Sequence, residues 1–221
     1  MTGDRIANIF SYLFHPVFYP PLVLIFYLYS NPIDFGQSTP GEDMILIFQT
    51  IITCTLLPLI AIFVMRRLNL ISSLQLEDRM ERIGPYIVMM IFLIWYYLSV
   101  DLYGIAPIYR IFILGGIITL ITLFVINLFT KVSLHSAGIS GLLTNVILSS
   151  SEFNYQMLMI QKDQNYFVMK FSYIIAVIFL ILFIVLLSRF YLRKHTIMEL
   201  MGGVLLGVFG QVFALKLIFI L

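Results

Sequence analysis

The segment from Ser188 to Glu199 brings together residue types that suit phosphoryl chemistry. It contains Arg189, and His195 and Glu199 stand four residues apart. Residues at that spacing share one face of an α-helix, so the carboxylate can accept a hydrogen bond from one ring nitrogen. The other nitrogen then stays free to act as a nucleophile or a base. The pair alone does not choose between this oriented imidazole and an interfacial histidine near an unrelated glutamate.

The residues that follow indicate where this pair points. Gly203, Gly207 and Gln211 continue the stripe of His195 and Glu199 at intervals of four. Small residues at that spacing allow helices to pack closely in lipid. We therefore expect this face of the final helix to turn toward the interior of a bundle.

A second segment supplies another histidine. Lys131, Ser133 and His135 precede an apolar run, so an ammonium, a hydroxyl and an imidazole lie where a helix is expected to begin. Helix N-termini present unpaired N–H groups and the positive end of the helix dipole, and both favour phosphate. The segment can therefore form one wall of an anion site, while Ser136 is expected to cap the helix.

Two arginines lie in a third polar segment. Arg79 and Arg82 are three residues apart and can share a face. Guanidinium groups bind phosphate oxygens in a bidentate manner. Glu77, Asp78 and Glu81 stand beside them, so an interfacial cluster of salt bridges is the alternative to a phosphate site.

The elements that must position these residues are membrane helices. Of the 221 residues, 61% are hydrophobic and 11% are charged, whereas soluble domains carry roughly 25% charged residues. A soluble chain of this length cannot bury so much apolar surface. Stretches that approach the roughly 20 apolar residues of a span are residues 9–30, 44–65, 86–100, 109–129, 137–151, 167–187 and 196–221. The sequence predicts one all-α domain over residues 1–221, a polytopic bundle of about six to seven membrane helices.

The polar segments between these stretches hold most of the basic residues. They are residues 66–85, 131–136 and 188–195, and two predicted helices separate each from the next. An even number of crossings returns the chain to the same face, so we expect all three segments at one membrane surface with the N-terminus. The positive-inside rule explains this gathering of Lys and Arg by topology alone. An anion site is the competing explanation.

Several functions and sites are not indicated. A net charge of +2 without a basic run gives no sign of nucleic-acid binding. Cys54 is the single cysteine, so no intrachain disulfide forms. No acidic cluster suits a metal site. His15 is expected at the membrane interface, with lining of a lipid access path as the alternative. The intramembrane amides are expected to form interhelical hydrogen bonds; they are Gln49, Asn127, Asn145 and Gln211.

Residues 188–199 resemble the third signature of the type-2 phosphatidic acid phosphatase superfamily, S-R-x5-H-x3-D. Ser188, Arg189 and His195 match it, and Glu199 places a carboxylate on a longer arm where the family has aspartate. The motif covers a small part of the chain but is fairly specific.

The other two signatures of that superfamily are matched less well. The second, P-S-G-H, is similar to residues 132–135, in which only Ser133 and His135 agree. The first, K-x6-R-P, is matched poorly by residues 79–85, which keep two arginines and Pro85 but lose the basic spacing and the adjacent arginine and proline.

The resemblance implies a division of roles. His195 would attack phosphorus and form a phosphohistidine, with Glu199 orienting its ring, and His135 would protonate the leaving oxygen. No metal and no other cofactor is implied. The side chains expected to hold the phosphoryl oxygens are Arg79, Arg82, Lys131, Ser133 and Arg189.

The expected function is that of a membrane-embedded lipid phosphatase. Its partners would be the bilayer and a lipid phosphate, either a polyprenyl pyrophosphate or a phosphatidyl phosphate, and its location the bacterial cytoplasmic membrane. The alternative is a catalytically degraded relative that binds or transports lipid. A membrane-embedded prenyltransferase would need aspartate-rich motifs, which the 11 acidic residues do not form. The face that carries the site and the oligomeric state stay open.

Overall fold

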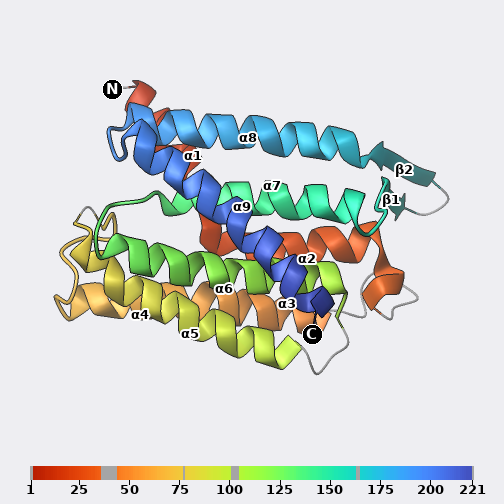
Figure 1. Cartoon of the computed structure of the whole chain (residues 1–221), viewed down its shortest axis with the longest axis horizontal. Helices are drawn as coiled ribbons and strands as arrows, with labels where there is room; N and C mark the ends of the chain where they lie inside the picture. The colour runs from red at the N-terminus through yellow and green to blue at the C-terminus, as the bar shows by residue number, and fades with distance from the viewer. Residues whose placement is uncertain (1, 36–43, 77, 101–104, 163–164, 221) are drawn as a thin grey trace.

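The computed structural model describes residues 2–35, 44–76, 78–100, 105–162 and 165–220 as a bundle of helices lying side by side (Figure 1). In these residues, six helical segments are long and apolar enough to cross a membrane. They are Gly3–Ser30, Met44–Arg67, Met80–Ser99, Pro107–Asn127, Phe171–Tyr191 and Ile197–Ile220. This confirms the predicted all-α membrane bundle, and the chain is an integral membrane protein.

The first span is broken in its middle. Helix α1 (Thr2–Leu13) is followed by the short 3-10 helix η1 (Pro16–Phe18) and then by α2 (Tyr19–Ser30). Proline disfavours helical backbone at the residue before it, and His15 is extended there, with φ −74° and ψ 132°. The stretch predicted as one helix over residues 9–30 is therefore two helices joined at His15.

The second span, Met44–Arg67, contains another irregularity. Helix α3 (Met44–Thr50) passes through the π-helical segment η3 (Ile51–Leu56) into α4 (Leu57–Arg67). Pro58 has no N–H for the carbonyl four residues earlier, and the wider π turn precedes it. The 3-10 helix η4 (Met80–Arg82) then leads into α5 (Ile83–Val100), which begins earlier than the predicted residues 86–100.

Helices α6 (Pro107–Asn127) and α7 (Leu134–Ser151) form the centre of the bundle. The predicted stretch 137–151 corresponds to α7, but it is not among the six segments apolar enough to span on their own. Its serine, threonine and asparagine side chains are tolerated because α7 packs against α6, α8 and α9. Ser140 Oγ, for example, donates to the carbonyl of Val204 at 3.1 Å.

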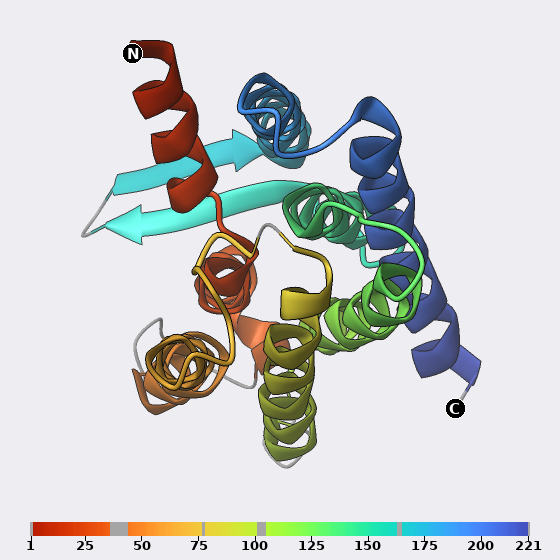
Figure 2. The same cartoon turned by 90° about the vertical axis from the view of Figure 1, so that its left-hand side faces the viewer.

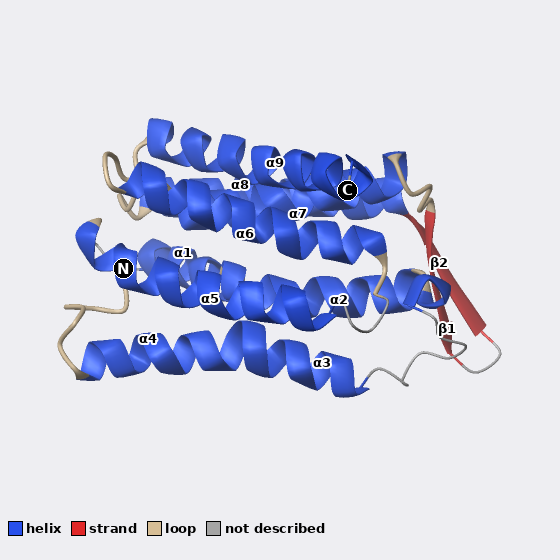
Figure 3. Ribbon diagram, turned by 60° about the horizontal axis from the view of Figure 1, so that its bottom comes forward, coloured by secondary structure: helices blue, strands red, loops and turns tan. Residues whose placement is uncertain are grey.

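The last third of the chain begins with a small hairpin. Strands β1 (Met157–Lys162) and β2 (Asn165–Lys170) pair antiparallel at one end of the bundle (Figure 3). Helix α8 (Phe171–Tyr191) runs back along the bundle, and α9 (Ile197–Ile220) follows. The predicted helix over residues 167–187 was wrong at its start, because residues 167–170 belong to β2.

Helix α9 packs closely against α7 and α6 through glycines. A Cβ atom on Gly203 would lie 2.5 Å from the carbonyl oxygen of Ser133, and one on Gly207 would overlap the carbonyl of Ala137. Gly203, Gly207 and Gln211 are buried, which confirms the predicted inward stripe. The close packing fixes the start of α9 beside the start of α7.

Buried amides join the helices further along the bundle. Asn145 Nδ2 donates to Gln211 Oε1 at 3.3 Å, and Gln211 Nε2 donates to the carbonyl of Phe112 at 3.2 Å. Asn127 Nδ2 donates to the carbonyl of Arg79 at 2.6 Å. These bonds confirm the interhelical role predicted for Asn145 and Gln211. Asn127 instead joins the end of α6 to the loop before η4, and the role of Gln49 stays a prediction.

Candidate active site

The three predicted segments meet at one end of the bundle, beside α1 (Figure 2). Arg82 Nη1 donates to the carbonyl of Val132 at 3.1 Å, which joins the first segment to the second. The backbone N–H of Ser133 donates to the carbonyl of Glu199 at 3.2 Å, which joins the second to the start of α9. These contacts confirm the convergence predicted from the crossing count. Helix α9 ends at Ile220, toward the opposite end (Figure 1).

His195 and Glu199 form the predicted pair. His195 Nδ1 lies 2.8 Å from Glu199 Oε2, and the two side chains are 2% and 22% exposed. The same carboxylate oxygen accepts from the backbone N–H of Thr196 at 3.3 Å, and Thr196 Oγ1 accepts from the N–H of Glu199 at 3.3 Å. This reciprocal pair is a capping box, so one carboxylate both caps α9 and orients the imidazole.

A tight turn presents this pair. The N–H groups of Arg193 and Lys194 donate to the carbonyls of Phe190 and Arg189, which ends α8. Arg193 has a φ of 52°, a left-handed conformation that is strained for a residue with a side chain. The turn therefore brings His195 back toward the bundle directly after α8.

The surroundings of His195 keep its ring neutral. Burial, reinforced by the positive charges of Arg82, Arg189 and Lys131, lowers the pKa of His195 to about 3. Since a carboxylate can only accept, Nδ1 carries the proton toward Glu199 and Nε2 keeps its lone pair. A neutral imidazole with a free Nε2 beside three cations is suited to attack an anionic phosphoryl group.

The second histidine belongs to the first turn of α7. His135 Nε2 lies 3.1 Å from the carbonyl oxygen of Ser11 in α1. Ser133 is the N-cap, because its side chain accepts from the N–H of Ser136 at 3.3 Å. The expectation that Ser136 caps this helix is wrong. The Ser133 side chain, predicted to bind phosphate, is fully buried and engaged at the cap.

The arginines before α5 hold the loops together. Arg79 Nη1 donates to the carbonyl of Leu128 at 2.8 Å, and Arg82 Nε donates to the carbonyl of Leu76 at 2.9 Å. Glu81 accepts two hydrogen bonds, from the N–H and the hydroxyl of Ser72. Asp78 accepts from the N–H of Met80 at 2.9 Å. These acidic groups therefore order the loop, and Glu77 lies outside the described residues.

A cavity of about 1150 Å³ reaches the His195–Glu199 pair. One face of α1 and one face of α8 form its apolar wall, through residues that include Ala7, Phe10, Ile184 and Leu187. The lining also includes polar and charged side chains, among them Lys131, Lys194, His195 and Glu199. An apolar wall that ends at cations and an imidazole suits an amphiphile with an anionic head. Predicted site residues outside this lining are Arg79, Arg82, Ser133, His135 and Arg189.

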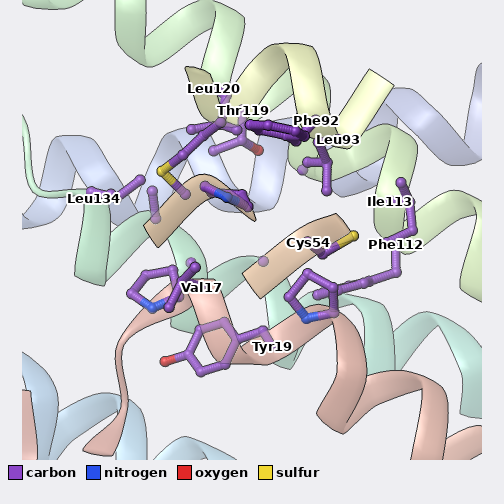
Figure 4. Close-up of a pocket in the computed structure, with 18 of the residues that line it drawn as sticks. Val17, Tyr19, Cys54, Phe92, Leu93, Phe112, Ile113, Thr119, Leu120 and Leu134 are labelled. Atoms are coloured by element: carbon purple, nitrogen blue, oxygen red, sulfur yellow. The ribbon is translucent and has the colours of Figure 1, made fainter. Parts of the chain in front are cut away.

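A second cavity, of about 80 Å³, lies deeper between α2, η3, α5, α6 and α7 (Figure 4). Val17, Tyr19 and Leu134 approach it from one side, and Phe92 and Phe112 from the other. The described residues that line it include no charged side chain. This cavity therefore offers no site for an anionic group.

Across the described part of the chain, no three His, Cys, Asp or Glu side chains gather where a metal ion could bind. No family model, no curated protein and no solved structure matches the chain.

Proposed function

We propose that this protein is a membrane-embedded lipid phosphatase of the type-2 phosphatidic acid phosphatase kind. It hydrolyses a phosphomonoester or a pyrophosphate at the head of a membrane lipid, in the bacterial cytoplasmic membrane. The observation that carries the proposal is the amphiphilic cavity, whose apolar wall on α1 and α8 leads to the His195–Glu199 pair.

His195 acts as the nucleophile. Its Nε2 lone pair attacks phosphorus while the bond to the leaving oxygen breaks, which leaves a phosphohistidine and a lipid alcohol or a lipid monophosphate. Glu199 accepts the Nδ1–H and stabilises the positive charge that develops on the ring. Water then attacks the phosphohistidine, releases inorganic phosphate and restores the neutral imidazole.

The surrounding residues complete the reaction. His135, when its ring is protonated on both nitrogens, gives the Nδ1 proton to the leaving oxygen and takes a proton back from the attacking water in the second step. Lys131 and Arg189 stabilise charge on the phosphoryl oxygens. Arg82 contributes its charge near His195, whose pKa it helps to lower. Arg79 and Ser133 act from further away, by holding the loops that present these groups. No metal takes part, since the basic side chains supply the positive charge.

The apolar lining that α1 and α8 give the cavity favours a lipid as the substrate. Ala7 and Phe10 of α1 and Ile184 and Leu187 of α8 are among the apolar residues that line the cavity. A lipid tail is as apolar as these side chains, so the wall can contact the hydrocarbon chain while the head group reaches the basic residues. The head group is thereby directed to the basic end.

A second candidate is a lipid-phosphate binding protein without hydrolytic activity. Two observations favour it. Arg79 and Arg82 donate hydrogen bonds to backbone carbonyls of the protein itself. The side chain of His195 is only 2% exposed. Such a protein would bind the same lipids through the same cavity and leave them intact.

One experiment separates the two candidates. The purified protein in detergent micelles is given phosphatidic acid or a polyprenyl pyrophosphate in the presence of EDTA, and released phosphate is measured together with lipid binding. The phosphatase releases phosphate, and His195→Ala abolishes the release. Binding without release by the wild-type protein supports the second candidate, and release that requires added Mg²⁺ contradicts both.

A further inference from the structure

The break in the first span frees a backbone carbonyl. The carbonyl of Phe10 accepts from the N–H of Phe14 at 3.0 Å, as in a continuing helix. The N–H of His15 donates to Tyr12 at 3.3 Å, where a continuing helix would have it donate to Ser11. The carbonyl of Ser11 instead accepts a hydrogen bond from Nε2 of His135 at 3.1 Å. The end of α1 thus supplies an acceptor to a ring on α7.

This contact selects one tautomer of His135. A carbonyl oxygen has no proton to give, so Nε2 must carry the hydrogen in the 3.1 Å contact. In the neutral ring, Nδ1 then keeps the lone pair. The ring is thereby fixed both in orientation and in the position of its proton.

The hydroxyl of Ser11 holds a second group of the site. Arg189 Nη1 donates to Ser11 Oγ at 3.5 Å, and Ser11 is only 5% exposed. His135 and Arg189 come from α7 and α8, so one buried residue of α1 joins two other helices.

His15 fixes the break itself. It is the N-cap of η1, since its Nδ1 accepts from the N–H of Val17 at 3.3 Å. Its ring lies edge-on to that of His135, with 4.9 Å between centroids and 90° between planes. Pro16 keeps α1 from continuing into α2, and the cap holds His15 in the conformation that sets how the two helices meet.

We propose that the helix break from Ser11 to His15 is a positioning element for the reaction, in which the His15 cap keeps the Ser11 carbonyl on His135 and its hydroxyl on Arg189. His15 is then a positioning residue that acts through His135. Its catalytic consequence rests on the proposed function, but the tautomer of His135 can be measured without turnover.

The test is ¹⁵N NMR of histidine-labelled protein in micelles, with a purification tag that contains no histidine. The chain has 3 histidines, so single substitutions assign the signals. We expect the Nε2–H tautomer for His135 in the wild-type protein. His15→Phe keeps an aromatic ring but loses the cap, and should give a mixture of tautomers. His15→Asn keeps a capping oxygen and should preserve the Nε2–H form.

The control is Leu13→Ala, at a lipid-facing position of the same helix end that is 61% exposed; it should leave the signals unchanged. An Nδ1–H tautomer in the wild-type protein overturns the inference, and so does a His15→Phe spectrum identical to the wild type. If His15→Phe fails to fold, the wild-type tautomer and His15→Asn still decide.

Kinetics distinguish the inference from the proposed function. His15→Phe should lower kcat by roughly 10-fold to 100-fold, since small displacements of reacting groups cost this much, with KM unchanged and with recovery in His15→Asn. If the His135 tautomer changes in His15→Phe as expected but the wild-type protein shows no turnover, only the proposed function is contradicted. If His15→Phe has the same turnover as the wild type, only the positioning role of the helix break is contradicted.

Discussion

The Nδ1 atom of His195 lies 2.8 Å from Oε2 of Glu199, and that same oxygen accepts the N–H of Thr196. The carboxylate that would orient the nucleophile is therefore part of the cap that begins α9. Glu199 therefore has two roles, orienting His195 and capping α9. Different substitutions remove each role, so experiments can distinguish them.

Glu199→Gln should lower turnover but leave the fold intact. Glutamine can still complete a capping box, yet it is neutral and cannot stabilise positive charge on His195, so kcat should fall about 10-fold to 100-fold. Thr196→Ala is the matched control; it should cost about 1 kcal/mol of stability through the lost cap with a smaller effect on kcat. Steady-state kinetics and thermal unfolding in micelles measure both. A Glu199→Gln protein with full activity contradicts the orienting role.

The pKa of His195, lowered to about 3, should make folding sensitive to acid. The unfolded chain binds a proton to this ring near its ordinary pKa of about 6.5, whereas the folded protein does not until about pH 3. Protonation therefore favours the unfolded state, and stability should be lost as the pH falls through this window. Thermal unfolding between pH 7 and pH 4 should show a larger loss for the wild type than for His195→Gln. Equal losses contradict the assigned pKa.

Gly207 should not tolerate a side chain. A Cβ atom there would overlap the carbonyl of Ala137, and backbone cannot move aside as a side chain can. Gly207→Ala should cost about 1–3 kcal/mol of stability, the usual range for overpacking. Gly202→Ala is the control on the same helix, since its Cβ would meet Val132 Cγ1 at an ordinary 3.8 Å. Equal unfolding temperatures for the two variants would contradict the close contact of α7 and α9.

Ala7 should determine whether long-chain lipids reach the site. It is 6% exposed and lies on the face of α1 that lines the apolar wall. Ala7→Trp should narrow the cavity at its apolar wall and raise KM for a long-chain lipid phosphate about 10-fold or more, while a water-soluble aryl phosphate is hydrolysed as before. Ile9→Trp, on the lipid-facing side of α1 at 62% exposure, is the control. If Ala7→Trp affects both substrates alike, the cavity wall does not hold the lipid chain.

The convergence of the three polar segments was predictable because it depends only on the number of membrane crossings between them. Long apolar runs fix how often the chain crosses, and crossing parity places Arg82, Ser133 and Glu199 at one end regardless of detailed geometry. The inward stripe of α9 was predictable for a similar reason, since glycines four apart mark a close helix contact.

Other features depended on backbone detail that the apolar pattern does not encode. The hairpin before α8 was missed because residues 167–170 continue the hydrophobic run of the helix. The cap of α7 is Ser133, three residues before the predicted Ser136, because the helix begins inside the polar segment and not at its last polar residue. The capping box of α9 has a readable sequence signal, Thr196-x-x-Glu199, in which the glutamate is also the partner of His195.

The parts of the site from α1 could not be predicted. Ser11 lies inside a continuous apolar stretch, and its carbonyl becomes available only because Pro16 interrupts the helix after it. The proximity of His15 to His135 depends on how α1 and α2 meet α7, a tertiary relationship between residues 120 positions apart.

The most direct test of the account is to trap the phosphoenzyme. Protein is mixed with an activated lipid phosphate labelled in its terminal phosphate, quenched within milliseconds in alkali, which preserves phosphohistidine, and the labelled residue is identified by mass spectrometry. We expect label on His195, none in His195→Ala, and continued labelling in His135→Ala, since an activated leaving group needs little protonation. Labelling of any other residue, or wild-type phosphate release by His195→Ala, would contradict the central claim that His195 is the nucleophile.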